Sequence, residues 1–90
     1  MDLKTVTKLT WTLNAWQDYC YWQRQDKKTL HRINRLIDAC LRTPFSGIGK
    51  PEGLKGDLSG FWSRRIDEQH RLVYQVTDFA IVVIACRYHY

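Results

Sequence analysis

The stretch GFWSRRIDEQHRLVYQVTDFAIVVIACRYH, residues 60–89, decides the fold of this chain. It contains three strand-like runs, 60–66, 69–76 and 79–89, separated by the polar pairs at 67–68 and 77–78. Short runs rich in β-branched and aromatic residues, with polar pairs between them, are typical of strands joined by tight turns. We therefore predict a three-stranded antiparallel meander. Its last strand is apolar on both faces, as a strand buried between layers would be.

The region before this meander predicts one short strand and two helices. KLTW (8–11) has strand character, Thr12 can cap a helix to about Arg24, and Asp26 can cap a second helix that ends at Pro44. The first helix has at helical spacing Leu13, Trp16, Tyr19, Cys20 and Gln23. The second has an apolar stripe of Leu30, Ile33, Leu36, Ile37, Cys40 and Leu41. Packing both helices on one face of an antiparallel sheet buries both stripes, which predicts a single α+β domain over 1–90 in the order β-α-α-β-β-β.

A glycine-rich segment separates the helices from the meander. All five glycines and both prolines of the chain fall within PFSGIGKPEGLKGDLSG, Pro44 to Gly60. We predict one long loop here, and a loop of this length in so small a domain is usually functional or disordered. It carries one carboxylate, Glu52, between two ammonium groups, Lys50 and Lys55.

Composition limits the classes of partner and the cell compartment that we expect. Fourteen Lys and Arg against nine Asp and Glu give a net charge of +5, which favours a polyanion or an acidic polypeptide as partner. The three cysteines lie far apart and outside any CxxC spacing, so they are interpreted as core residues, with no metal site and no cofactor expected. No apolar run is long enough to span a membrane, and we expect a cytoplasmic protein with no membrane contact.

Charged residues gather on the predicted meander and at its end. Alternation along a strand would place Arg87 and His89 on one side, and Tyr88 and Tyr90 on the other. Arg65 would face Arg71 across the sheet if the turn holds three residues, 67–69, and would lie on the opposite face if it holds two. The sequence leaves that register open. Like charges that face each other across strands are destabilising, so such a pair suggests a phosphate site.

Together these groups could cleave RNA without a metal. Attack by the 2′-hydroxyl needs a base, cations that stabilise the phosphorane, and an acid for the departing 5′-oxygen; the pKa of an ordinary histidine suits the acid role. The plainer interpretation is also open: Glu52 and His89 as solvated residues, the arginines as guards of a sheet edge. Trp62 and Tyr74 are interpreted as core residues. We assign no chemical role to His31 or His70. Composition and spacing alone therefore predict no more than a basic α+β domain suited to binding RNA.

Four motifs carry a resemblance to a known family. TPFSGIGKPEGLKGDLSGFWSRRIDEQHRLVY (43–74), ACRYHY (85–90), DYCYWQRQDKK (18–28) and KLTW resemble the YoeB/Txe toxins of bacterial toxin–antitoxin modules, in the RelE-like superfamily. The similarity extends from about Lys8 to Tyr90, and Met1–Thr7 looks like an extension. Gly53 stands where relatives often carry proline, which should change the stiffness of the loop more than its chemistry.

The resemblance implies a ribosome-dependent endonuclease that cuts the mRNA codon in the ribosomal A site. It implies Glu52 as the base, Arg71 as a clamp on the scissile phosphate, His89 as the acid and Tyr90 as a positioning or stacking group. The substrate-binding set is Lys55, Arg65, Lys50 and Arg87.

The resemblance also implies partners. These are a YefM/Phd-type antitoxin, the 70S ribosome with its mRNA, operator DNA through the antitoxin only, and a second copy of the chain in a homodimer. Two alternatives belong to other classes: a ParE-like inhibitor of DNA gyrase without acid–base chemistry, and an RNA-binding or corepressor module with vestigial enzymatic groups. An activity measurement separates them.

Overall fold

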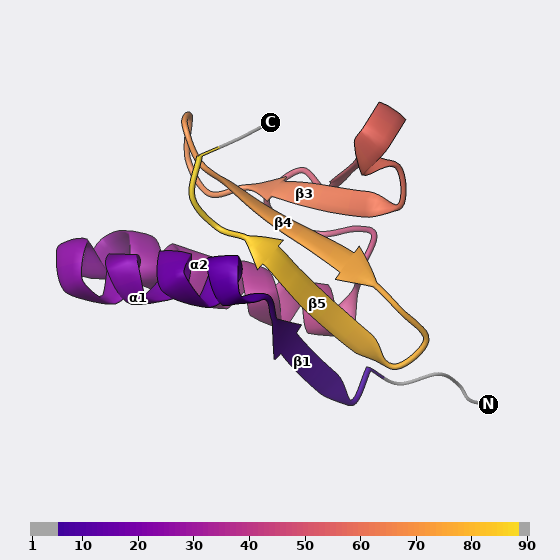
Figure 1. The fold of residues 1–90 in the computed structure, drawn as a ribbon, viewed down its shortest axis with the longest axis horizontal. Coiled ribbons are helices and arrows are strands. Elements are labelled where there is room, and N and C mark those ends of the chain that lie inside the picture. The colour runs from indigo at the N-terminus through magenta and orange to yellow at the C-terminus, as the bar shows by residue number, and fades with distance from the viewer. Residues whose placement is uncertain (1–5, 89–90) are drawn as a thin grey trace.

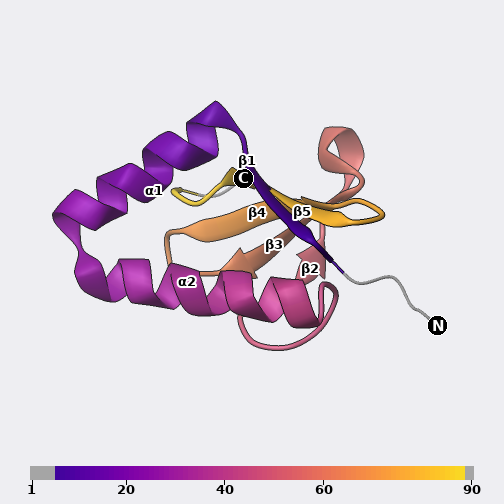
Figure 2. The same cartoon turned by 90° about the horizontal axis from the view of Figure 1, so that it is seen from below.

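Two helices and five strands make up the part of the chain that the structure, a computed structural model, describes: residues 6–88. In chain order these elements and one 3-10 turn are β1 (Lys8–Trp11), α1 (Leu13–Gln25), α2 (Lys27–Arg42), β2 (Glu52–Gly53), η1 (Gly56–Leu58), β3 (Phe61–Arg65), β4 (Arg71–Val76) and β5 (Ala80–Ala85). Figure 1 shows the strands as one twisted sheet, and Figure 2 shows the helices as an open V. No described helix is long and apolar enough to cross a membrane.

The sheet has the order β1-β5-β4-β3-β2. β3, β4 and β5 form the predicted antiparallel meander, so the α+β class and the meander are confirmed. Two features differ from the prediction. The sheet is mixed, because β1 lies at its edge parallel to β5, with Lys8 opposite Ala80. The glycine-rich segment is also not a continuous loop, since Glu52 and Gly53 pair with β3 as a short edge strand.

Both helices begin at the predicted caps. The Thr12 hydroxyl accepts a hydrogen bond from the Ala15 N–H (3.0 Å), and the Asp26 carboxylate accepts from the N–H groups of Lys28 and Thr29. The Asp26 side chain also accepts from the Thr29 hydroxyl, and these bonds hold the pKa of Asp26 below its ordinary value. A side-chain oxygen at this position satisfies backbone donors that have no partner within the helix.

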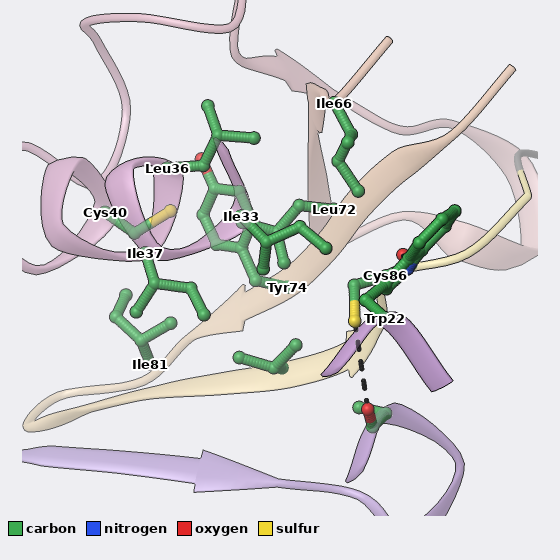
Figure 3. Close-up of a cluster of buried hydrophobic side chains, with 12 residues drawn as sticks. Trp22, Ile33, Leu36, Ile37, Cys40, Ile66, Leu72, Tyr74, Ile81 and Cys86 are labelled. Atoms are coloured by element: carbon green, nitrogen blue, oxygen red, sulfur yellow. Dashed lines mark hydrogen bonds between the residues drawn. The ribbon is translucent and has the colours of Figure 1, made fainter. Parts of the chain in front are cut away.

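The core lies between the helices and one face of the sheet (Figure 3). α2 contributes Ile33, Leu36, Ile37 and Cys40, which confirms the buried part of its predicted stripe. From the sheet come Ile66, Leu72, Tyr74, Ile81, Val83 and Cys86. Because β4 and β5 present alternate residues to the helices, their other face is left for the functional groups. Tyr74 is fully buried, as predicted, whereas Trp62 is only partly buried against the core.

The predicted buried face of α1 is wrong in part: Tyr19 packs against the core, but Leu13 and Trp16 do not. Leu13 and Trp16 are 73% and 47% exposed, and the buried residues of this helix are Ala15 and Trp22. Ala15 has a small side chain, so the helix backbone comes close enough to β5 for the Cys86 thiol to donate to the Ala15 carbonyl at 3.8 Å (Figure 3). Trp16 instead stacks on the Tyr19 ring and meets the Trp11 ring edge-to-face.

Two of the three cysteines fill the core, as predicted. Cys40 and Cys86 are fully buried, whereas Cys20 is partly exposed. Burial raises the pKa of the Cys86 thiol to about 12, and it also raises the pKa of Cys40. Both buried thiols therefore stay protonated at neutral pH, and a protonated thiol is a poor nucleophile.

The last strand ends earlier than predicted, at Ala85. Val73 pairs with Ala85 and Tyr74 with Val83, so Ile84 is an extra residue and forms a β-bulge. A bulge changes which side the following residues face. The predicted alternation of residues 87–90 assumed that the strand continues to residue 89, whereas Cys86 already packs into the helical core beyond the strand and Tyr88 turns back with φ +65°. His89 and Tyr90 lie outside the described residues.

Candidate functional site

The open face of the sheet brings the predicted arginines together. Arg65 pairs directly with Arg71 across β3 and β4. The turn holds three residues, 67–69, because the Ile66 and Asp67 N–H groups both donate to the His70 carbonyl. The register that the sequence left open is therefore the one that sets Arg65 and Arg71 opposite each other on the same face. Such a pair costs free energy unless an anion lies between the two charges.

A depression of 140 Å³ on this face is lined by Glu52, Leu54, Ser63 and Arg71. Glu52 reaches it because β2 pairs with β3, with Glu52 opposite Ser63. A second depression of 440 Å³ adjoins it and is lined by Arg32, Arg65, Ile66, Asp67, Glu68 and Arg71. Arg71 belongs to both. The structure thus gathers one carboxylate and two of the predicted cations, and it adds Arg32, whose guanidinium donates to the Arg65 carbonyl at 3.0 Å.

The remaining predicted residues are less closely grouped. Lys50 and Lys55 are exposed on the segment that flanks β2, and Lys50 has a positive φ of 51°. Arg87 lies over the Tyr21 ring at 3.6 Å and lines a separate depression of 540 Å³ between α1 and the end of the chain. His89 and Tyr90 lie outside the described residues. Within residues 6–88, no three His, Cys, Asp or Glu side chains gather as ligands for a metal ion.

Arg64 anchors the glycine-rich segment from inside the protein. It is fully buried, and its guanidinium donates to the carbonyls of Thr43 (2.6 Å), Ser46 (2.8 Å) and Ile48 (2.9 Å) and to the Tyr74 hydroxyl (3.1 Å). The Tyr74 hydroxyl in turn donates to the Pro44 carbonyl at 2.7 Å. Burial raises the pKa of Tyr74 to about 12, so the hydroxyl keeps its proton. One arginine thus fixes the chain that leads to Glu52.

Gly49 lets this segment pass close to the core. Its φ is +83°, and a Cβ added there would lie 2.7 Å from the Leu36 side chain and 3.0 Å from the Arg64 Cβ. The Gly49 carbonyl also accepts from the Arg65 N–H at 2.7 Å. A residue with a side chain would be strained in both backbone and packing. The segment therefore approaches β3 at this glycine, three residues before Glu52.

We expect Arg64→Met to destabilise the fold by about 3 kcal/mol, because it leaves buried oxygens without their donor. For a domain of this size that lowers the Tm by more than about 10 °C. Thermal unfolding followed by circular dichroism measures it. The matched control is Arg65→Met: this neighbouring side chain is exposed, and its loss should change stability by no more than about 0.5 kcal/mol. Equal melting of both variants would contradict the anchoring role.

Several hydrogen bonds hold the chain after β5. The Trp22 indole N–H donates to the Cys86 carbonyl at 2.8 Å, and the Asp18 carboxylate accepts from the Cys86 N–H at 3.0 Å. The Tyr88 N–H donates to Nδ1 of His70 at 2.6 Å. Burial raises the pKa of Asp18 above its ordinary value, in opposition to its hydrogen bond from the Cys86 N–H and to the nearby Arg87.

Arg64 and His70 are the important residues that the sequence analysis missed. A signal for each was present. Arg64 has the same strand parity as Trp62 and Ile66, and His70 has the same parity as Leu72 and Tyr74. Alternation would have assigned both polar residues to the core face, where a polar group needs hydrogen-bond partners.

A helical hairpin on one face of a five-stranded mixed sheet, with a carboxylate and arginines on the other, defines a toxin of the RelE-like class. The particular family follows from sequence. Residues 11–90 match the family described as the YoeB-like toxin of bacterial type II toxin–antitoxin systems, and the chain belongs to that family.

Comparisons with individual proteins agree with this family assignment. The chain is 60% identical over 83 residues to toxin YoeB of Escherichia coli K12. These residues are 92% of this chain and 99% of the E. coli toxin. Among solved structures, a YoeB/ParE toxin from Agrobacterium tumefaciens is 53% identical with a TM-score of 0.91, covering 93% and 100% of the two chains. Two structures from Staphylococcus aureus have TM-scores of 0.86. A YoeB dimer is 44% identical and covers 98% and 100%, and a heterotetrameric YoeB–YefM complex is 45% identical and covers 94% and 98%.

Proposed function

We propose that this toxin is a ribosome-dependent endoribonuclease that cuts mRNA in the A site and so stops translation. The observation that carries the proposal is the depression shared by Glu52 and Arg71, with Arg65 directly across from Arg71. It offers a proton acceptor and two positive charges at one place on an exposed face. Those are the groups that cleavage by an internal 2′-hydroxyl requires, apart from the acid.

In the proposed reaction Glu52 removes the proton of the 2′-hydroxyl, whose oxygen attacks the adjacent phosphorus. Arg71 and Arg65 stabilise the negative charge that builds up on the phosphorane oxygens, with help from Lys55. His89 gives a proton to the departing 5′-oxygen, and Tyr90 positions or stacks on the neighbouring base. The products are a cyclic 2′,3′-phosphate and a free 5′-hydroxyl. Lys50 and Arg87 contact the phosphates that flank the cut.

The partners follow from the same proposal. The S. aureus relative is found in a complex with YefM, which supports a cognate antitoxin of that type as a partner of this chain. The acidic tail of the antitoxin would cover the open face of a domain of net charge +5. Operator DNA would be bound through the antitoxin. Self-association is supported by the dimer of the S. aureus relative. We propose the cytoplasm as the site of action, because ribosomes are there.

Primer extension on a defined mRNA tests the function. We expect wild-type protein to produce cuts within A-site codons when ribosomes are present, and no cuts on the naked transcript. Glu52→Gln keeps the shape of the side chain but removes its basicity, and we expect it to slow cleavage by about 10² to 10⁴-fold.

The same assay decides between the alternatives. Wild-type protein that binds ribosomes but leaves the mRNA intact would instead indicate an RNA-binding module. Gyrase inhibition without mRNA cleavage would indicate a ParE-like inhibitor. A Glu52→Gln variant as fast as wild type would remove Glu52 from the reaction while leaving the class of activity unchanged.

A further inference from the structure

His70 is a buried histidine that lies beside the site but has no role in the proposed chemistry. It is only 9% exposed, and its ring packs edge-on against Trp22 with the centroids 4.9 Å apart. Its Nδ1 accepts the Tyr88 N–H at 2.6 Å, across eighteen positions of sequence. The Tyr88 N–H therefore satisfies this buried ring nitrogen and ties it to the chain after β5.

The direction of that hydrogen bond fixes the state of the imidazole. Nδ1 accepts, so it carries no proton, and the ring proton of the neutral side chain lies on Nε2. The groups around His70 are Asp18 and Trp22 on α1, Asp67 in the preceding turn, and Tyr88 after β5. The Asp67 carboxylate accepts the backbone N–H of His70 at 2.7 Å, which ties the histidine to the turn between β3 and β4.

Tyr88 is held in a conformation that it would not adopt freely. Its φ of +65° is in the left-handed region, which costs a residue with a Cβ about 1 kcal/mol or more. Such a conformation persists only where its surroundings impose it. Two neighbouring residues do so here: His70 accepts the Tyr88 N–H, and the Arg71 N–H donates to the Tyr88 carbonyl at 2.9 Å.

We propose that His70 is a positioning residue of the cleavage reaction, because its Nδ1 fixes Tyr88, the residue that precedes the proposed acid in the chain. The proposal rests on the proposed function. Its geometric basis is that one dipeptide, His70-Arg71, holds Tyr88 at both its N–H and its carbonyl while the Arg71 side chain lines the depression with Glu52. The same strand end thereby holds the proposed phosphate clamp and the point from which the chain continues to the proposed acid.

Three substitutions at position 70 separate positioning from packing. His70→Asn keeps an acceptor where Nδ1 lies, His70→Gln moves the acceptor to about the position of Nε2, and His70→Leu removes it. The Asn and Gln variants are a matched pair of neutral amides. Ribosome-dependent cleavage gives kcat and KM, and hydrogen exchange of the Tyr88 amide, followed by NMR, reports the contact without any activity.

We expect the Tyr88 amide to be protected in wild type and in His70→Asn, and to exchange freely in the other two variants. We expect kcat to fall by about 10- to 100-fold in His70→Gln and His70→Leu, with KM nearly unchanged, because a small displacement of a catalytic group is costly. His70→Asn should stay within about fivefold of wild type. If His70→Leu does not fold, the comparison of Asn with Gln decides.

Two results would overturn the proposal. One is a His70→Gln or His70→Leu variant that cuts at the wild-type rate on ribosomes. The other is an equal loss of kcat in Asn and Gln, since that would mean the ring matters through its packing. Failure of the proposed function is a different result, namely a wild-type protein that leaves mRNA uncut.

Discussion

A chain that ends at Tyr88 is expected to cleave mRNA on the ribosome about 10² to 10⁴-fold more slowly than the full chain, because it lacks the proposed general acid. Loss of Tyr90 would add to this. Folding should be nearly unaffected, since the bonds from His70 and Arg71 to the tail end at Tyr88 and the core ends at Cys86. We expect the Tm to fall by no more than a few degrees.

Single-turnover cleavage and thermal unfolding of the two proteins measure these effects. His89→Gln is the companion variant: it keeps hydrogen bonding but cannot supply a proton efficiently, so it should show the loss from the general acid, about 10² to 10⁴-fold, without the added loss of Tyr90. A truncated chain that cuts at the full rate would remove both terminal residues from the reaction. A truncated chain that melts far below the full chain would show that they stabilise the fold.

Arg71→Ala should slow cleavage by about 10² to 10³-fold, the loss typical of removing one donor to a developing negative charge. The effect should appear in kcat, because the charge on the phosphorane exists only in the transition state. Ribosome binding should be kept, since it draws on the whole basic surface.

Arg35→Ala is the matched control, because Arg35 is exposed on α2, and α2 packs on the other face of the sheet. It removes the same charge and should leave kcat unchanged. An Arg71→Ala variant that cuts at a rate near that of Arg35→Ala would exclude Arg71 as the clamp. Rate constants from ribosome-bound mRNA, measured at saturating toxin, make the comparison.

The sequence predicted the secondary structure correctly where apolar residues recur at a regular strand or helix spacing. The period-2 runs predicted β3, β4 and β5, and the stripe Ile33–Ile37–Cys40 predicted the buried face of α2. α1 has large apolar and aromatic residues around most of its circumference, so the sequence could not show that Ala15 and Trp22, rather than Trp16, face the core. The parallel pairing of β1 with β5 joins distant residues and has no local signal.

The residues of the candidate site could be predicted from the sequence. The contacts and backbone features that position them could not. Glu52, Arg65 and Arg71 were named from the sequence, and the structure places them together on the open face. What the sequence could not give was the three-residue turn, the bulge at Ile84 and the four oxygens around Arg64. Each depends on contacts between segments far apart in the chain, which no periodicity records.

The pairing of β1 with β5 affects how the protein can fold while it is being synthesised. Lys8 lies opposite Ala80, so the edge strand β1 has no partner in the sheet until the ribosome has made residues 80–85. Contacts between such distant positions form slowly, because a long segment must first be closed into a loop. A nascent toxin that stops before β5 would also lack Ile81, Val83 and Cys86 from its core. The sheet that carries Arg71 is therefore incomplete until β5 has been synthesised.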